Sequence, residues 1–226
     1  MEFICMREQE ETNRRLTEAG VLLYVPTTCY IGSEVTVGAG SKIFPNTVIL
    51  GQTVIGENCV IGPNTVIMDS KIGDNNEIVS SHLTNATVES EVKIGPFAYL
   101  RPNAHIKSNA KIGNFVEIKN AVVGEGTKAS HLTYIGDADV GKYCNFGCGA
   151  VVANYNGKEK TRSKIGNHAF IGCNTNLVSP VEVGDFGYTA AGSTITRNVP
   201  EGALAIARAK QENNKGWVKR KGYLDK

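Results

Sequence analysis

An aliphatic residue returns every six positions along most of this chain, and a glycine follows it in many of the repeats. The longest unbroken series are Ile31, Val37, Ile43, Ile49, Ile55, Ile61 and Ile67, and then Ile94, Leu100, Ile106, Ile112 and Ile118. An amphipathic helix repeats about every 3.6 residues and a half-buried strand every two, so neither pattern fits. A sustained period of six predicts an all-β solenoid of short parallel strands, with three sides and about 18 residues in each coil.

A small or β-branched residue stands four places after the aliphatic one in many repeats: Ser41, Thr47, Thr53, Cys59 and Thr65, then Ala98, Ala104, Ala110 and Val116. We expect the aliphatic side chain to point into the prism and stack on its counterpart one coil away. The small residue fills the remaining interior space. Glycine after the aliphatic position suits a tight bend, where a side chain or a negative φ is a burden. Asparagine also tolerates bends, and four fall at or near them: Asn46, Asn64, Asn75 and Asn76.

The ends of the chain leave this repeat. Residues 6–19 form a polar stretch that predicts a short helix ended by Gly20. Residues 154–164, NYNGKEKTRSK, are polar and turn-rich, so we expect this loop to be extruded from the prism. The expected organisation is an N-terminal helix and lead-in over 1–30, a β-helix over 31–203, and an irregular, basic tail over 204–226.

Composition excludes several classes of function. The net charge of +2 over 226 residues gives no electrostatic case for nucleic-acid binding. The chain shows no run of 18 apolar residues and no signal peptide, so a cytoplasmic protein without a membrane partner is expected. The six cysteines form no CxxC pair, and buried or incidental reduced thiols are expected rather than a metal site.

The segment 94–209 resembles the acetyltransferase domain of the bifunctional GlmU family, within the hexapeptide-repeat acyltransferases. The resemblance rests on IGPFAYLRP (94–102), IGNFVEIKNA (112–121), GTKASHLTYIGDADVG (126–141), NFGCGAVVANYNGKEK (145–160), FIGCNTNLVSPVEVG (170–184) and ALAIARAKQ (203–211). HLTYIGDADVG and ANYNG are not explained by the repeat and are therefore specific. Weaker similarity extends back to about residue 6.

This resemblance implies a left-handed β-helix that works as a homotrimer, with active sites between subunits. It implies acetyl-CoA as co-substrate and transfer of acetyl to glucosamine 1-phosphate, a step toward UDP-GlcNAc and cell-wall precursors. No metal is implied for this transfer. Nothing in the chain matches the family's nucleotide-binding half, so uridylyl transfer is expected to be missing.

His131 lies within HLTY and interrupts the aliphatic pattern. An amino-sugar nitrogen must lose a proton as it attacks a thioester, and an imidazole titrates in the range that suits a general base. The resemblance assigns that role to His131. It assigns none to His82, His105 or His168, for which surface or packing roles are expected.

The extruded loop carries the next candidates. Attack on acetyl-CoA creates an oxyanion, which needs hydrogen-bond donors already in place. A side-chain amide such as Asn154 can supply one donor and a loop backbone N–H another. The family places Asn154 and Tyr155 at acetyl-CoA, and a lysine matching Lys160 faces the sugar phosphate bound at a neighbouring subunit.

Arg101 and Lys119 stand where the repeat places solvent-facing side chains. An arginine fork and a lysine point charge together suit a phosphate, and the family uses the matching residues for that purpose. Its sugar-hydroxyl contacts map to Tyr134 and Asn145. Its coenzyme A contacts map to Cys148, Cys173, Ala191 and Arg208. Cys173 replaces a serine of some members, and a thiol donates a weaker hydrogen bond than a hydroxyl.

Three alternatives remain open. In the first, the acetyltransferase acts on a different amino sugar, for instance a nucleotide-linked one. In the second, the prism is a non-catalytic oligomerisation or sensor module, which loss of the base or of the loop would favour. In the third, the chain is a trimeric zinc carbonic anhydrase with the same prism, which needs three histidines converging at a subunit boundary.

Overall fold

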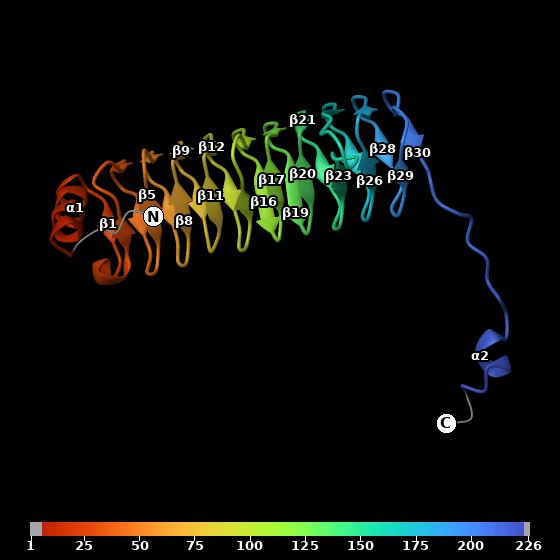
Figure 1. Ribbon diagram of the computed structural model, residues 1–226, viewed down its shortest axis with the longest axis horizontal. Coiled ribbons are helices and arrows are strands. Elements are labelled where there is room, and N and C mark those ends of the chain that lie inside the picture. Colours follow the sequence, from red (N-terminus) through yellow and green to blue (C-terminus); the bar gives the residue numbers. More distant parts are fainter. Residues whose placement is uncertain (1–5, 224–226) are drawn as a thin grey trace.

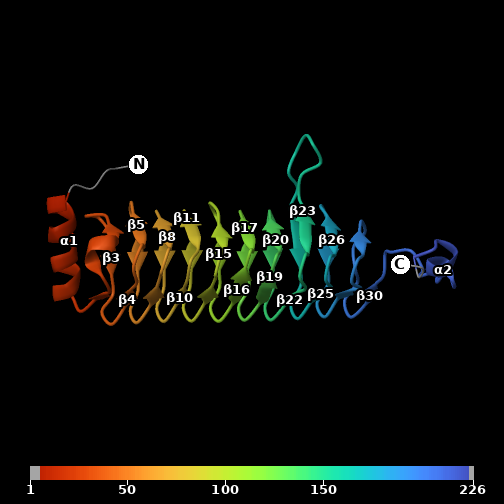
Figure 2. The ribbon, with the colours of Figure 1, turned by 90° about the horizontal axis from the view of Figure 1, so that it is seen from below.

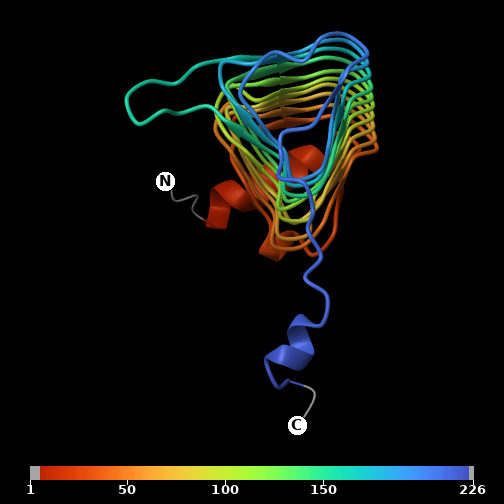
Figure 3. The same cartoon turned by 90° about the vertical axis from the view of Figure 1, so that its right-hand side faces the viewer.

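The computed structural model describes residues 6–223. The chain winds into a long column of stacked coils (Figure 1). Helix α1 (Met6–Glu18) lies at one end, and a tail with the short helix α2 (Trp217–Arg220) leaves the other. Seen end-on, the column is a three-sided prism from which one loop projects (Figure 3). This is the all-β parallel solenoid that the period of six predicted.

Each side of the prism is a parallel sheet. Sheet A contains, in spatial order, β1 (Leu22–Leu23), β4 (Lys42–Ile43), β7 (Val60–Ile61), β10 (Glu77–Ile78), β13 (Lys93–Ile94), β16 (Lys111–Asn114), β19 (Lys128–His131), β22 (Asn145–Phe146), β25 (Phe170–Ile171), β28 (Tyr188–Thr189) and β30 (Leu204–Ala205). Sheet B contains β2 (Tyr30–Ile31), β5 (Val48–Leu50), β8 (Val66–Met68), β11 (His82–Thr84), β14 (Tyr99–Leu100), β17 (Glu117–Lys119), β20 (Tyr134–Gly136), β23 (Val151–Ala153), β26 (Asn176–Val178) and β29 (Thr194–Ile195). Sheet C contains β3 (Thr36–Val37), β6 (Val54–Ile55), β9 (Lys71–Ile72), β12 (Thr87–Val88), β15 (His105–Ile106), β18 (Val122–Val123), β21 (Ala138–Val140), β24 (Ser163–Ile165) and β27 (Glu182–Val183). From β1 to β29 the chain visits sheets A, B and C in turn. The paired strands begin at Leu22 and end at Ala205, so they extend beyond 31–203 at both ends.

The aliphatic residues of the repeat fill the prism. In sheet A, Ile43 pairs with Ile61 and Ile61 with Ile78, and all three side chains are fully buried. Their strand neighbours, such as Lys42, point outward and are exposed. Burying one such side chain contributes about 1.5–3 kcal/mol, and this gain requires a neighbouring coil on each side.

The small interior residues are buried as predicted, and their hydroxyls are satisfied by the backbone. The Thr47 hydroxyl donates to the Phe44 carbonyl at 2.7 Å, and that of Ser41 to the Gly56 carbonyl at 2.9 Å. Asn76 directly follows Asn75, whose φ is left-handed, so it lies next to a bend as predicted. Its side chain is buried and donates to the carbonyls of Gly73 and Glu89, because its amide spans the gap between adjacent coils.

The glycine after the aliphatic residue has different reasons at different coils. At Gly38 the reason is close approach, since a Cβ would lie 2.6 Å from the backbone nitrogen of Glu57 in the next coil. Gly62 and Gly95 have left-handed φ, 96° and 103°, as expected for a tight bend. After Gly56 the left-handed φ falls two residues later, at Asn58, with φ 55°. Asn46, Asn64 and Asn75 also have left-handed φ, as their position at bends predicted.

The shifts of register in the sequence correspond to coils of unequal length. Ile55 pairs with Ile72, so that coil is one residue shorter than the coil joining Ile43 to Ile61. Coil length therefore varies while the interior position stays in register.

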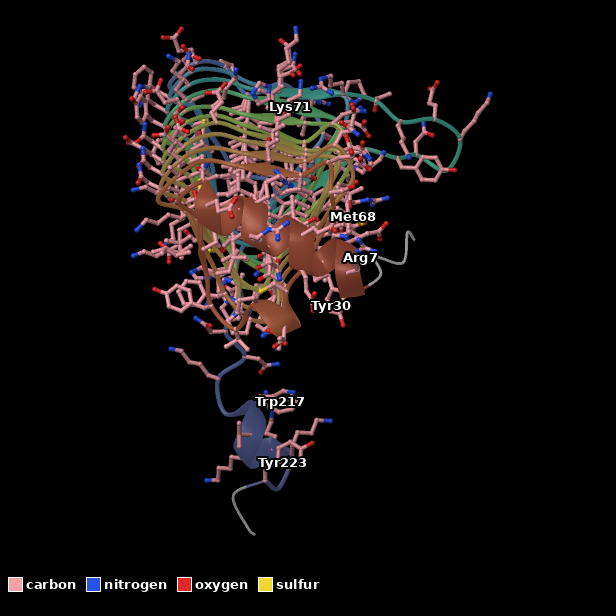
Figure 4. All side chains as sticks on the ribbon, turned by 90° about the vertical axis from the view of Figure 1, so that its left-hand side faces the viewer. Arg7, Tyr30, Met68, Lys71, Trp217 and Tyr223 are labelled. Atoms are coloured by element: carbon pink, nitrogen blue, oxygen red, sulfur yellow. The ribbon has the colours of Figure 1, made fainter. Side chains whose placement is uncertain are left out.

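Helix α1 lies across the N-terminal end of the prism (Figure 4). Leu16 is buried against the first coil, and the Arg15 guanidinium donates to the carbonyls of Ser33 and Val35. The helix thus covers apolar surface and satisfies backbone acceptors that the first coil would leave open. Among the helices of residues 6–223, none is long and apolar enough to cross a bilayer.

We predict that Gly38→Ala lowers the free energy of unfolding by about 1–3 kcal/mol, because the added methyl group meets backbone that cannot move aside. Gly32→Ala is the matched control. Gly32 also follows an aliphatic residue, but its Cβ would meet nothing closer than 3.6 Å, so a change within about 0.5 kcal/mol is expected. Urea unfolding measures both values, and equal losses would contradict the close-approach explanation.

Candidate functional site

The loop between β23 and β24 projects from the prism where sheets B and C meet (Figures 2 and 3). Its neck is closed by a hydrogen bond from the Thr161 N–H to the Asn154 carbonyl at 2.9 Å and by an antiparallel bridge between Tyr155 and Lys160. At its tip the Asn156 Oδ1 accepts hydrogen bonds from the backbone N–H groups of Lys158 and Glu159. The excursion is therefore an ordered hairpin over residues 154–162.

Asp137 fixes the root of this hairpin. Its carboxylate is buried at the corner between sheets B and C, and it accepts hydrogen bonds from the side-chain amides of Asn120 and Asn154, which lie in the coils on either side. Asn154 is itself only 6% exposed. One of its two amide hydrogens is thus committed to Asp137 rather than directed outward.

Arg162 holds the returning strand of the hairpin. Its guanidinium donates to both carboxylate oxygens of Asp139, at 2.7 and 2.6 Å. It also donates to the carbonyls of Asn120 and Ala138. Three successive coils are therefore tied together at the point where the chain leaves the prism.

Charge gathers beside this root. Burial alone raises the pKa of Asp137, but the amides of Asn120 and Asn154 and the ammonium groups of Lys119 and Lys160 outweigh burial and lower it overall. The pKa of Lys119 is lowered, and the side-chain contact with Lys160 is the largest cause. The negative charge of Asp137 acts in the opposite direction and raises the pKa of Lys119. The charges of two lysines from one chain therefore both act on one buried carboxylate.

Arg101 extends this basic cluster along the outer face of sheet B. Leu100 pairs with Ile118, so Arg101 and Lys119 stand in adjacent coils. The Arg101 guanidinium pairs with Glu117 at 2.7 Å, which raises its pKa. Tyr134 follows Glu117 in the same outward-facing column. Arg101 and Lys119, both predicted to hold the phosphate, thus stand in adjacent coils on one face of sheet B, and Lys160 of the hairpin lies next to Lys119 in the same chain.

His131 lies at the other edge of sheet B, at the corner with sheet A. Its side chain is exposed, and Nδ1 lies 2.6 Å from Oδ1 of Asn114 in the preceding coil. Because Oδ1 only accepts, this contact places the proton of a neutral imidazole on Nδ1. The Nε2 lone pair is then available as a base.

The predicted coenzyme A residues follow His131 along this corner. Ala129, Phe146, Ile171 and Thr189 pair successively, and two residues beyond each stand His131, Cys148, Cys173 and Ala191. The Arg208 side chain passes within 3.9 Å of where a Cβ on Gly192 would lie, so it reaches the same corner. Asn145 is half-buried on the adjoining face of sheet A.

A single chain does not bring all candidates to one point. Strand β20 separates the corner that carries His131 from the corner that carries Asn154, so sheet B lies between the predicted base and the predicted loop. Tyr155 sits on the hairpin, 57% exposed, with its hydroxyl donating to the Gly157 carbonyl. The loop residues thus face away from the His131 corner of their own chain.

Four residues of this region were not predicted from the sequence: Asp137, Asn120, Arg162 and Asn114. A signal exists for Asn114, since the register of Ile112 and Ala129 places it beside His131. The partners of Asp137 depend on three coils at once and have no pattern in the linear sequence. Within residues 6–223, no three His, Cys, Asp or Glu side chains are grouped as metal ligands.

We predict that Asp137→Asn lowers the free energy of unfolding by about 1–3 kcal/mol at neutral pH, because one amide group then faces another donor. Limited digestion with trypsin should cut the hairpin, which contains Lys158 and Lys160, faster than in the parent. The native pKa of Asp137 is lowered from 3.8. Its stabilisation is therefore complete above about pH 4 and is lost as pH falls through the lowered value, where the two proteins should converge.

Asp139→Asn is the comparison variant. Asp139 is 48% exposed in its pair with Arg162, so a smaller loss of stability is expected. Unchanged trypsin sensitivity of Asp137→Asn would show that this carboxylate does not hold the loop.

Known proteins share this sequence pattern and architecture. Residues 34–68 and 85–120 match the family model described as bacterial transferase hexapeptide (six repeats). The chain is 55% identical over 205 residues to the bifunctional protein GlmU of Clostridium beijerinckii, covering 91% of this chain and 45% of that protein. It is 57% identical over 209 residues to GlmU of Clostridium perfringens, covering 92% and 46%.

Among solved structures, LpxA, a UDP-N-acetylglucosamine acyltransferase from Bacteroides fragilis, aligns with a TM-score of 0.50 at 17% identity, over 78% of this chain and 69% of that one. This likeness concerns the fold, the left-handed parallel β-helix that the resemblance implied. The chain spans less than half the length of the GlmU proteins it matches. The chain therefore carries the bacterial transferase hexapeptide repeat and is homologous, over nine-tenths of its length, to part of GlmU.

Proposed function

We propose that this chain is an acetyl-CoA-dependent N-acetyltransferase that converts glucosamine 1-phosphate to N-acetylglucosamine 1-phosphate. The observation that carries the proposal is the corner column in which Asn114 orients His131, and His131 is followed by Cys148, Cys173 and Ala191. Sequence identity to GlmU at more than half of the aligned positions supports the same activity. This product serves UDP-GlcNAc and cell-wall precursor synthesis.

The proposed transfer is direct. The sugar amine attacks the thioester carbonyl, Nε2 of His131 accepts the amine proton, and coenzyme A leaves as a thiol. Asn114 keeps the imidazole in the tautomer that this step needs. The acyl donor lies along the corner beside Cys148, Cys173 and Ala191, and Arg208 pairs with its phosphate groups.

The phosphate of the acceptor is held by Arg101 and Lys119 of one chain, with Lys160 supplied by a neighbouring chain. An arginine fork and lysine point charges together match the charge of a dianionic phosphate. Tyr134 and Asn145 are positioned for sugar hydroxyls on the two faces beside His131. Asn154 contributes to the oxyanion through its second amide hydrogen together with loop backbone N–H groups, while its first hydrogen fixes the hairpin on Asp137.

The active unit is proposed to be a homotrimer. Phe97, Phe115 and Leu132 form a ridge at the His131 corner, each more than half exposed and each with left-handed φ, which is rare for bulky residues. The rings of Phe97 and Phe115 stack at 5.5 Å. A second chain covering this ridge would place its own Tyr155 and Lys160 beside the base, which sheet B prevents within one chain.

We predict that the chain releases coenzyme A thiol with glucosamine 1-phosphate as acceptor and much less with glucosamine or UDP-glucosamine. His131→Ala should lower kcat by about 10²–10⁴-fold, the range for a lost general base. His82→Ala, on the outer face of sheet B, is the control and should match the parent. Steady-state rates measure all three proteins.

Preference for UDP-glucosamine would shift the assignment to a nucleotide-linked acceptor. Absence of thiol release with every amino sugar would favour the non-catalytic module. Stoichiometric zinc in metal analysis would revive the carbonic anhydrase alternative.

We predict a light-scattering mass of three chains of 24.2 kDa each. Phe115→Asp should reduce this mass, because a carboxylate would be buried in the interface. Phe186→Asp is a matched control, since Phe186 is also an exposed aromatic with left-handed φ but lies at the corner between sheets C and A. A parent mass near that of one chain would contradict the trimer.

A further inference from the structure

The described cysteines fall into two groups. Cys29, Cys59 and Cys144 are buried, and burial raises the pKa of each thiol. Cys148 and Cys173 are exposed. Buried thiols with raised pKa are inert, so among the five cysteines of residues 6–223 chemistry with solutes is expected only at the exposed two. Cys5 lies outside the described residues.

The two exposed cysteines stand one above the other in neighbouring coils. Phe146 pairs with Ile171, and each cysteine is two residues further along. The Asn174 N–H donates to the Cys148 carbonyl at 2.8 Å, which keeps the coils in register through this corner. A Cβ on Gly147 would lie only 2.5 Å from the Cys173 nitrogen, so the two turns are closely nested.

This spacing is compatible with a disulfide. Neighbouring parallel strands lie about 4.8 Å apart, within the Cα separation of about 4.4–6.8 Å that disulfides accept. Side chains that stand parallel at this spacing have Cβ atoms slightly further apart than the usual disulfide value of about 3.8 Å. A bridge here would therefore be somewhat strained and easily reduced, which is typical of reversible disulfides rather than structural ones.

We propose that Cys148 and Cys173 form a dithiol site that is oxidised reversibly to an intrachain disulfide by a low-molecular-weight disulfide. One cysteine thiolate attacks the small disulfide and releases one small thiol, leaving a mixed disulfide on the protein. The second cysteine thiolate then attacks the protein sulfur and releases the other small thiol. The two cysteines lose two electrons, the small disulfide gains them, and the two cysteine protons pass to the released thiolates.

The consequence for activity rests on the proposed function. Both cysteines lie in the column between His131 and Ala191 that would hold the acyl donor, so bridging them would cross-link that surface and change its shape. Neither position contributes to the prism interior, so the bridge would alter the site without opening the core.

The test begins with reduced protein incubated with glutathione disulfide, blocked with an alkylating reagent and digested with trypsin. Lys158, Lys160 and Arg162 lie between the cysteines, so a bridge appears in mass spectrometry as two linked peptides. We expect this linked pair in the parent, its loss on treatment with dithiothreitol, and alkylation of Cys144 only after unfolding. Cys148→Ser and Cys173→Ser should each carry glutathione on the remaining exposed cysteine.

Glutathione adducts on both cysteines of the parent without the linked pair, or disulfide-bonded dimers on a non-reducing gel, would overturn the proposed site. Acetyl-CoA affinity of the bridged parent should fall at least about tenfold and recover on reduction. Unchanged affinity would overturn the effect on the acyl-donor surface. A reduced parent with no acetyl transfer would instead contradict the proposed function, while the peptide readout would still report on the dithiol.

Discussion

In-register stacking of aliphatic side chains inside the prism is the constraint on which the other features depend. Ile43, Ile61 and Ile78 occupy one interior line because the backbone of each coil donates hydrogen bonds to the next. Apolar burial is available only between coils, and it fixes both their spacing and their rotation. A coil that loses one residue, as at Ile72, still returns its aliphatic residue to the interior. Residues on the outer faces are not constrained by this burial, but the stacked coils hold them at a constant spacing.

This regularity produces the chemistry of the candidate site. Residues that are about one coil apart in sequence become neighbours at a corner, which is how Asn114 reaches His131 and how Cys148 meets Cys173. An excursion such as the 154–162 hairpin is tolerated because Asn154 and Arg162 tie its two ends to Asp137 and Asp139. The same corners expose Phe115 and Leu132 in a strained conformation, which suits a surface covered in an assembly. The prism thus supplies a rigid frame, while corners and the hairpin carry the polar groups.

Much of the fold could be predicted from the period of six, because a residue that is buried in every coil recurs at a fixed spacing in the sequence. Details that depend on contacts between coils could not be predicted. Gly38 is needed for close approach between coils rather than for φ, and the buried Asn76 side chain bonds to carbonyls of two coils. For the candidate site, the resemblance supplied His131, the basic cluster and the corner residues, whose roles remain proposals. It did not show that the Asn154 amide is engaged by Asp137, since that contact joins coils across a buried corner.

The sequence by itself determined the solenoid, its interior residues, the N-terminal helix and the segment that leaves the prism. Each of these follows from hydrophobic spacing or from turn-forming composition, which act locally along the chain. Only the tertiary structure decided that Asp137 joins Asn120 to Asn154, that Lys119 and Lys160 lie together near that carboxylate, and that β20 separates His131 from the hairpin. Those relations depend on the rotation and length of successive coils. A pattern of residue types does not encode which side chains from different coils converge on one buried group.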